Sequence, residues 1–151
     1  MLEALHKLFA GDNRVTIVSH DFGNGLPAME SFDAVSSFAI HHVSHQRKRA
    51  LYREILELLD PNGVFCNLEH VASASPRLHA EFLQAISCAE EDPSNKVLDV
   101  ETQLAWLREI GFVDVNCHCK WRELALLAGQ ASRERPGARN KLTGKVLHLI
   151  P

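Results

Sequence analysis

The segment from Phe32 to Val71 constrains the fold of this chain more than any other part of the sequence. Residues 32–40 form a nearly continuous apolar run, which is typical of a strand covered on both faces, as in parallel sheets. An amphipathic helix with Ser44 as its cap comes next, and Pro61-Asn62-Gly63 ends it before a second apolar strand over 64–68. A strand, a helix and a strand in this order predict neighbouring parallel strands in an α/β domain.

The remaining elements extend this pattern on both sides. Residues 2–9 have helical spacing, and a short apolar strand over 15–18 ends at Ser19-His20-Asp21. Further along, a helix is expected from Ser75-Pro76 to about Ala89, another from Asp99 to Gly111, and two strands over 112–119 and 124–128. The sequence therefore predicts a mostly parallel sheet that finishes in a C-terminal antiparallel hairpin.

Composition excludes several classes of function. The chain has 151 residues, enough for one domain, and its 46% apolar and 23% charged residues are ordinary globular values. A net charge of -3 gives no attraction to nucleic acid or to a membrane surface. The sequence contains neither a membrane-spanning run nor the layout of a secretion signal, so we expect a cytoplasmic protein without nucleic-acid or membrane partners.

The four cysteines are too scattered for a disulfide framework. Cys117 and Cys119 flank His118, which suggests a metal site. On a strand, however, the two thiols would lie on one face and the imidazole on the other, and the sequence has no spaced second ligand pair. We therefore expect structural cysteines and no metal site.

Five short motifs occur in a fixed order along the chain. They are Met1-Leu2 in a helix, Asp21 after a strand, FDAVSSFAIHH from Phe32 to His42, LDPNG from Leu59 to Gly63, and LREIGF from Leu107 to Phe112. In this combination, residues 1–129 resemble the class I S-adenosylmethionine-dependent methyltransferases that act on small molecules. The resemblance implies a Rossmann-like fold, S-adenosylmethionine as cofactor and methyl transfer to a small-molecule acceptor. Residues 130–151, which are polar and basic before a final apolar stretch, are expected to form a flexible tail.

The chain departs from the family pattern at the cofactor site. The family has a glycine-rich turn after its first strand and an acidic residue at the end of its second, and the sequence shows neither. Gly23 and Gly25 precede no suitable helix. We therefore expect an N-terminally truncated domain, with Met1 an internal methionine or the chain a gene remnant, and with impaired activity. Because the absent strands are central in the family, the chain should re-pair its strands, form a homo-oligomer through exposed strand edges, or be marginally stable.

The resemblance assigns the cofactor-binding residues. It implies that Asp21 accepts a hydrogen bond from the adenine amino group, and that the backbone N–H of Phe22 faces the adenine ring. Ser37 and Phe38 would lie beside the methionine and sulfonium part of the cofactor. The alternatives are a turn-capping aspartate and an ordinary buried strand, and the sequence leaves both open.

Polar residues near the ends of the second and third strands are the predicted residues of the methyl-acceptor site. His42 is the predicted catalytic proton acceptor, because imidazole titrates near neutral pH. His41, Glu69 and His70 are expected to border the acceptor pocket, although each is also compatible with a structural role. Two functions stay open: a methyltransferase, or a non-catalytic remnant that serves as an interaction or oligomerisation module. A nicotinamide-binding fold is a weaker third option, because its glycine fingerprint is absent.

Overall fold

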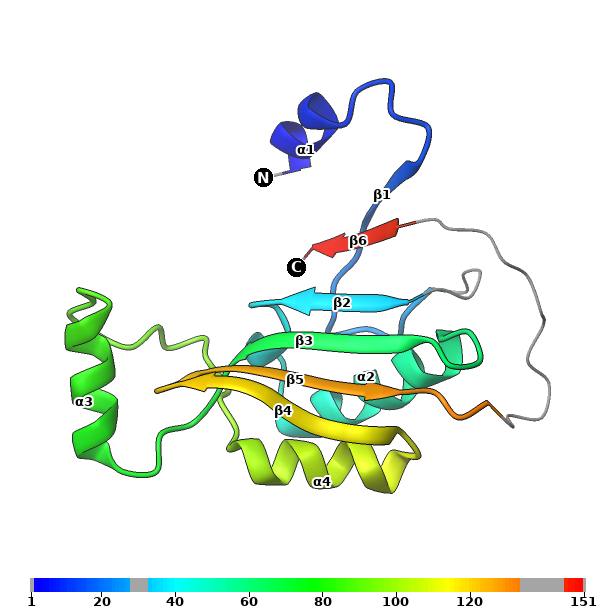
Figure 1. Ribbon diagram of the computed structural model, residues 1–151. Helices are drawn as coiled ribbons and strands as arrows, with labels where there is room; N and C mark the ends of the chain where they lie inside the picture. The colour runs from blue at the N-terminus through cyan, green and yellow to red at the C-terminus, as the bar shows by residue number, and fades with distance from the viewer. Residues whose placement is uncertain (1, 28–32, 134–145, 151) are drawn as a thin grey trace.

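A computed structural model of the chain describes residues 2–27, 33–133 and 146–150 (Figure 1). In chain order the elements are α1 (Leu2–Leu8), β1 (Val15–Ser19), β2 (Ala34–Ser37), the 3₁₀ turn η1 (Ile40–His42), α2 (His45–Leu58), β3 (Val64–His70), α3 (Pro76–Ala85), α4 (Val100–Ile110), β4 (Val113–Trp121), β5 (Leu124–Gln130) and β6 (Val146–Ile150). The helices of the described part are all too short or too polar to cross a membrane.

The main sheet has four strands in the order β2-β3-β5-β4. Strands β2 and β3 are parallel, with Ala34 opposite Phe65 and Ser37 opposite Leu68. Strand β5 runs antiparallel to both β3 and β4, so the expected C-terminal antiparallel hairpin is confirmed. The expectation of a mostly parallel sheet is wrong for this sheet, because β5 inserts between β3 and β4 and makes two of its three strand pairs antiparallel.

Strand β1 is not hydrogen-bonded to the main sheet. It pairs in parallel with β6, with Val15 opposite Val146 and Ser19 opposite Ile150, in a separate two-stranded sheet. Figure 1 shows β6 lying between β1 and β2. Strand β1 thus takes its partner from the C-terminal part of the chain and not from the main sheet. Residues 134–145 of the predicted tail lie outside the described part of the chain.

Several element boundaries differ from those predicted. The expected strand over 32–40 is β2, which ends at Ser37, because Phe38 has a positive φ of 50° and the chain then turns into η1. Its first predicted residue, Phe32, lies outside the described residues. Helix α3 ends at Ala85 rather than near Ala89, and Ser87 beyond it has a φ of 55°. Strand β3 extends two residues further than predicted, so Glu69 and His70 are its last residues.

One face of the main sheet is covered by α2 and α4 (Figure 1). Ser44 caps α2 by accepting a hydrogen bond from the backbone N–H of Arg47, and Asp99 caps α4 in the same way through Thr102. Gly111 ends α4 with a φ of 116°, a conformation that favours glycine. The apolar stripes of both helices pack with Phe65 and Phe112 in one core, which also contains Leu51, Tyr52, Ile55, Leu56, Leu59 and Leu107.

The opposite face of β2 is open to solvent. Ala34 packs against the core, and the next side chain, Val35, points the other way and is 78% exposed. Strand β2 is also one of the two edge strands of the main sheet. An apolar side chain beside unpaired backbone is the kind of edge that other strands can join.

Candidate functional site

The candidate site begins where β3 ends and β2 passes into η1. Because β2 and β3 are parallel neighbours, their carboxyl ends lie side by side, and His41 meets Glu69 there. The Nδ1 atom of His41 is 2.8 Å from Oε1 of Glu69, and the backbone N–H of His41 donates to the same oxygen at 3.1 Å. Both side chains are buried, with exposed fractions of 7% and 0%.

Donors surround the carboxylate of Glu69. Oε1 also accepts from the backbone N–H of His70, and Oε2 accepts from the side-chain amide of Asn67, both at 3.1 Å. A carboxylate only accepts hydrogen bonds, so Nδ1 of His41 is the protonated ring nitrogen in this pair. Nε2 of His41 then carries the free lone pair, which is the arrangement of a positioned general base.

A layer of buried polar groups lies next to this pair. The hydroxyl of Tyr52 donates to Oε1 of Gln103 at 2.6 Å, and burial raises the pKa of Tyr52 well above its usual value. The Lys48 side chain is also buried, which lowers its pKa, while the nearby charge of Glu69 acts in the opposite direction. Buried polar groups of this kind favour one arrangement, because a group that loses its hydrogen-bond partner in the interior is left unsatisfied.

The segment between α3 and α4 covers the histidines. The backbone N–H of Lys96 donates to the carbonyl of His41 at 2.7 Å, and Nδ1 of His42 is 3.0 Å from Oγ of Ser94. Partial burial lowers the pKa of His42, and the neighbouring His41 lowers it further. The His42 side chain is exposed, and among the described residues it has no buried carboxylate partner of the kind that positions His41.

The rings of the predicted acceptor-side residues form a group around His41. The ring centroids of His41 and His42 are 4.1 Å apart, and the His41 ring makes edge contacts with His70 at 5.5 Å and with Phe38 at 6.5 Å. The structure thus brings Phe38, His41, His42, Glu69 and His70 together. Ser37 is exposed at the end of β2, next to Phe38.

Asp21 lies in a tight turn that follows β1. Its Oδ1 atom accepts from the N–H of Gly23 at 2.8 Å, and Oδ2 accepts from the side chain of Asn24 at 3.2 Å. The predicted alternative, a turn-capping aspartate, therefore describes its present contacts. Asp21 is exposed, whereas the Phe22 side chain is buried in the core.

Arg47 attaches this turn to the first turns of α2. Its Nε atom donates to the carbonyl of Phe22 at 2.7 Å, and one Nη atom donates to the carbonyl of Asn24. The guanidinium also makes two bonds to Glu54, which lower the pKa of that carboxyl. Glu54 in turn accepts from the N–H of Leu26. The loop after β1 is thus fixed to the helix that follows the histidines.

A second cluster near His70 was not predicted from the sequence. Glu123, in the turn between β4 and β5, is 1% exposed, and its carboxylate meets Nε2 of His70, Nδ1 of His79 and the hydroxyl of Ser73. Burial by itself would raise the pKa of Glu123, but these hydrogen bonds outweigh that effect and lower it. The participants are up to 53 residues apart, so no local spacing signals the cluster.

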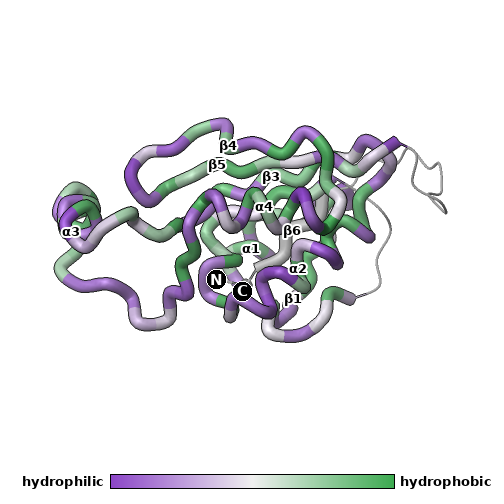
Figure 2. Tube along the Cα trace, turned by 90° about the horizontal axis from the view of Figure 1, so that it is seen from below, coloured by the Kyte–Doolittle hydropathy of each residue, from purple (hydrophilic) through white to green (hydrophobic). Residues whose placement is uncertain are grey.

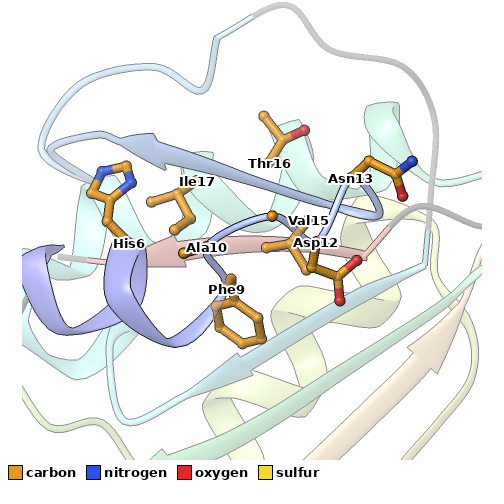
Figure 3. A pocket seen from close by; sticks show the side chains of 9 residues that line it. His6, Phe9, Ala10, Asp12, Asn13, Val15, Thr16 and Ile17 are labelled. Carbon is orange, nitrogen blue, oxygen red and sulfur yellow. The ribbon is translucent and has the colours of Figure 1, made fainter.

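A hollow of about 520 Å³ lies elsewhere, between α1 and β1 (Figure 3). It is lined by residues such as His6, Phe9, Asp12 and Ile17, and it contains none of the predicted site residues. The hollow is wide open and has no buried titratable pair, so the chemistry of the side chains places the candidate site at the ends of β2 and β3 instead.

Comparison with known proteins bears on this geometry. Residues 1–63 match the family described as methyltransferase domain. This part of the chain contains β1, β2, the His41-His42 turn and α2. The resemblance to S-adenosylmethionine-dependent methyltransferases is confirmed. No curated protein matches the sequence.

Solved structures share the methyltransferase fold at low sequence identity. An O-methyltransferase family protein from Burkholderia thailandensis has a TM-score of 0.68 and 17% identity, over 89% of this chain and 42% of its own. The S-adenosylmethionine-dependent methyltransferase SibL has a TM-score of 0.65 and 20% identity, over 87% of this chain and 41% of its own. An O-methyltransferase family 2 protein from Planctomyces limnophilus, in complex with apigenin, has a TM-score of 0.61 and 15% identity, over 85% of this chain and 39% of its own. The chain therefore spans about two fifths of the length of these methyltransferases.

Proposed function

We propose that this chain is part of an S-adenosylmethionine-dependent methyltransferase that transfers a methyl group to a hydroxyl of a small molecule. The match of residues 1–63 to the methyltransferase-domain family carries this proposal. The pair of His41 and Glu69 supports it, because a hydroxyl acceptor must lose a proton as its oxygen takes the methyl group.

The residues of the chain fit one part of the cofactor. The exposed carboxylate of Asp21 accepts one hydrogen bond at each oxygen and has lone pairs left for the adenine amino group. Ser37 and Phe38, exposed at the end of β2, suit the sulfonium side. The sequence has no glycine-rich strand-turn-helix for the methionine part, so the affinity of these 151 residues for the cofactor is expected to be low and their activity impaired.

His41 is the preferred proton acceptor in this proposal, and His42 is the alternative. When bound, the cofactor supplies an activated methyl group, so the protein has mainly to align the acceptor and exclude water. Glu69 holds Nδ1 of His41, which leaves Nε2 to take the proton. The segment that contacts His41 and His42 through Lys96 and Ser94 lies over the buried His41, while His42 stays exposed. Apigenin and simpler phenols are suitable first acceptors to test.

The exposed Asp21 provides a direct test of the cofactor site. We expect Asp21→Ala to weaken S-adenosylmethionine binding by about three- to tenfold, the value of one hydrogen bond of about 1 kcal/mol. Asp12→Ala is a matched control, because Asp12 also holds a turn through its own carboxylate, here with Arg14. Affinities would be measured by calorimetry at millimolar cofactor. Equal affinities of the two variants would remove Asp21 from the site, and no binding by the unaltered chain at these concentrations would contradict the proposal.

A non-catalytic interaction module is the second candidate, and the exposed Val35 on the edge strand β2 favours it. In this case the chain associates with another copy along β2. Val35→Lys is then expected to convert oligomers into monomers in analytical ultracentrifugation, since a lysine on an edge strand opposes pairing. Leu8→Lys, at an equally exposed apolar position on α1, should leave the oligomers intact. A chain that is monomeric without any substitution would exclude this candidate.

A further inference from the structure

Side chains of metal-ligand type converge between α3 and the sheet. His70 comes from the end of β3, Glu123 from the turn between β4 and β5, and Glu91 from the segment after α3. One ligand atom of each lies within 4.8 Å of the others. His79 of α3 stands between the two carboxylates, with Nδ1 2.9 Å from Oε1 of Glu123 and Nε2 3.2 Å from Oε2 of Glu91. Four separate parts of the chain thus supply two imidazoles and two carboxylates to one place.

We infer that His70, Glu91 and Glu123 form a binding site for a divalent transition-metal ion of the zinc type. Imidazole nitrogen and carboxylate oxygen are ligands that Zn²⁺ accepts, at distances of about 2.0–2.2 Å. Ligand atoms of a tetrahedral site are then about 3.3 Å apart. Nε2 of His70 and Oε2 of Glu123 are 2.9 Å apart, so an ion that replaces the hydrogen bond between them requires a small separation of these two atoms. It also requires a movement of the half-exposed Glu91 toward them.

Other polar side chains contact the three ligand residues and hold them in position. Ser73 donates to Glu123, and His79 contacts both carboxylates, which holds them in place for an ion. The side-chain nitrogen of Asn95 lies 3.4 Å from Nδ1 of His70, and Oδ1 of Asn95 is buried without a partner among the described residues. When Glu91 turns toward an ion, the Asn95 amide can rotate so that Oδ1 accepts the Nδ1 proton of His70. Nε2 of His70 is then free to bind the metal.

The position of the cluster indicates what the ion would do. Both views show α3 standing at one end of the molecule, away from α2 and α4 (Figures 1 and 2). Among the described contacts, those that hold α3 include the His79–Glu123 pair and the ring of Phe82, which lies against His70 at 5.3 Å. An ion bound by His70, Glu91 and Glu123 would link β3, the hairpin turn and the segment after α3. The same segment covers His41 and His42 through Lys96 and Ser94, so the ion would order the acceptor side of the candidate site.

A titration of the full chain with Zn²⁺ tests this inference. Calorimetry should show one ion bound per chain, and Glu91→Gln should weaken binding at least about tenfold, as loss of a metal-site partner does. Glu90→Gln is the matched control, since Glu90 is exposed in the same segment. The Glu90→Gln variant should bind Zn²⁺ as tightly as the unaltered chain. Glu123→Gln should also weaken Zn²⁺ binding. Because Glu123 is buried, this substitution can prevent folding, and the result for Glu91→Gln then decides the test. No heat at millimolar Zn²⁺, or equal affinities of Glu91→Gln and Glu90→Gln, would overturn the inference.

The free thiols of Cys117 and Cys119 are the competing zinc ligands. The double variant Cys117→Ser, Cys119→Ser should bind Zn²⁺ as tightly as the unaltered chain. Co²⁺ offers a second readout, because thiolate ligands add a strong near-ultraviolet charge-transfer band that a histidine and carboxylate site lacks. Loss of Zn²⁺ binding in the double variant, or that band with bound Co²⁺, would place the ion at the cysteines and overturn the inference.

Discussion

Replacing Glu69 with alanine is expected to lower the free energy of unfolding by about 3–5 kcal/mol, because each buried donor left without its acceptor costs about 1–3 kcal/mol. The substitution leaves several buried donors without their acceptor: the N–H and Nδ1 of His41, the N–H of His70 and the amide of Asn67. It also removes a negative charge that acts on the buried Lys48. This is a large share of the stability of a domain, which is typically about 5–15 kcal/mol.

Urea unfolding followed by circular dichroism would measure this loss. Glu57→Ala is the matched control, because Glu57 is exposed on α2 and its removal should change the free energy of unfolding by no more than about 0.5 kcal/mol. A cost below about 1 kcal/mol for Glu69→Ala would mean that the carboxylate is not held in the buried network described here.

The second large effect concerns catalysis. Replacing His41 with glutamine is expected to lower the rate of methyl transfer by about 10²–10⁴-fold, the usual contribution of a positioned general base. Glutamine keeps a polar side chain beside Glu69 but has no lone pair of suitable basicity. The rate would be measured at millimolar S-adenosylmethionine, with radiolabelled methyl groups and phenolic acceptors.

His42→Gln is the comparison that separates the two histidines. Its side chain is exposed and contacts Ser94 instead of a buried carboxylate, so we expect a loss of less than about tenfold. The opposite result, a large loss with His42→Gln and a small one with His41→Gln, would assign the proton acceptor to His42, as the sequence alone predicts.

Much of the fold follows from local patterns in the sequence. The apolar stripe from Leu51 to Leu59, the Ser44 and Asp99 caps and Gly111 specify α2 and α4, and these elements are present as predicted. The end of β2 could not be predicted, because no local pattern signals the positive φ of Phe38, whose N–H still donates to the carbonyl of Leu68 on β3. The pairing of β1 with β6 joins segments more than a hundred residues apart and has no local signal.

The candidate site was also predicted only in part, because some of its contacts follow from the strand order and others depend on tertiary structure. Polar residues at the ends of adjacent parallel strands meet, so His41, Glu69 and His70 could be placed together from the sequence. Which imidazole would be held by the carboxylate was not predictable, because it depends on the 3₁₀ turn that buries His41 and exposes His42. The cluster around Glu123 depends on the hairpin turn and α3 meeting in space, which residue spacing does not indicate.

The central claim is that the ends of β1, β2 and β3 border one methyl-donor and acceptor site. A map of backbone amide shifts on adding S-adenosylmethionine to the ¹⁵N-labelled chain tests this claim most directly. We predict that the shifts concentrate at Asp21–Gly23 and at Ser37–His42. Shifts confined to the hollow between α1 and β1, or no shifts at millimolar cofactor, would contradict the claim.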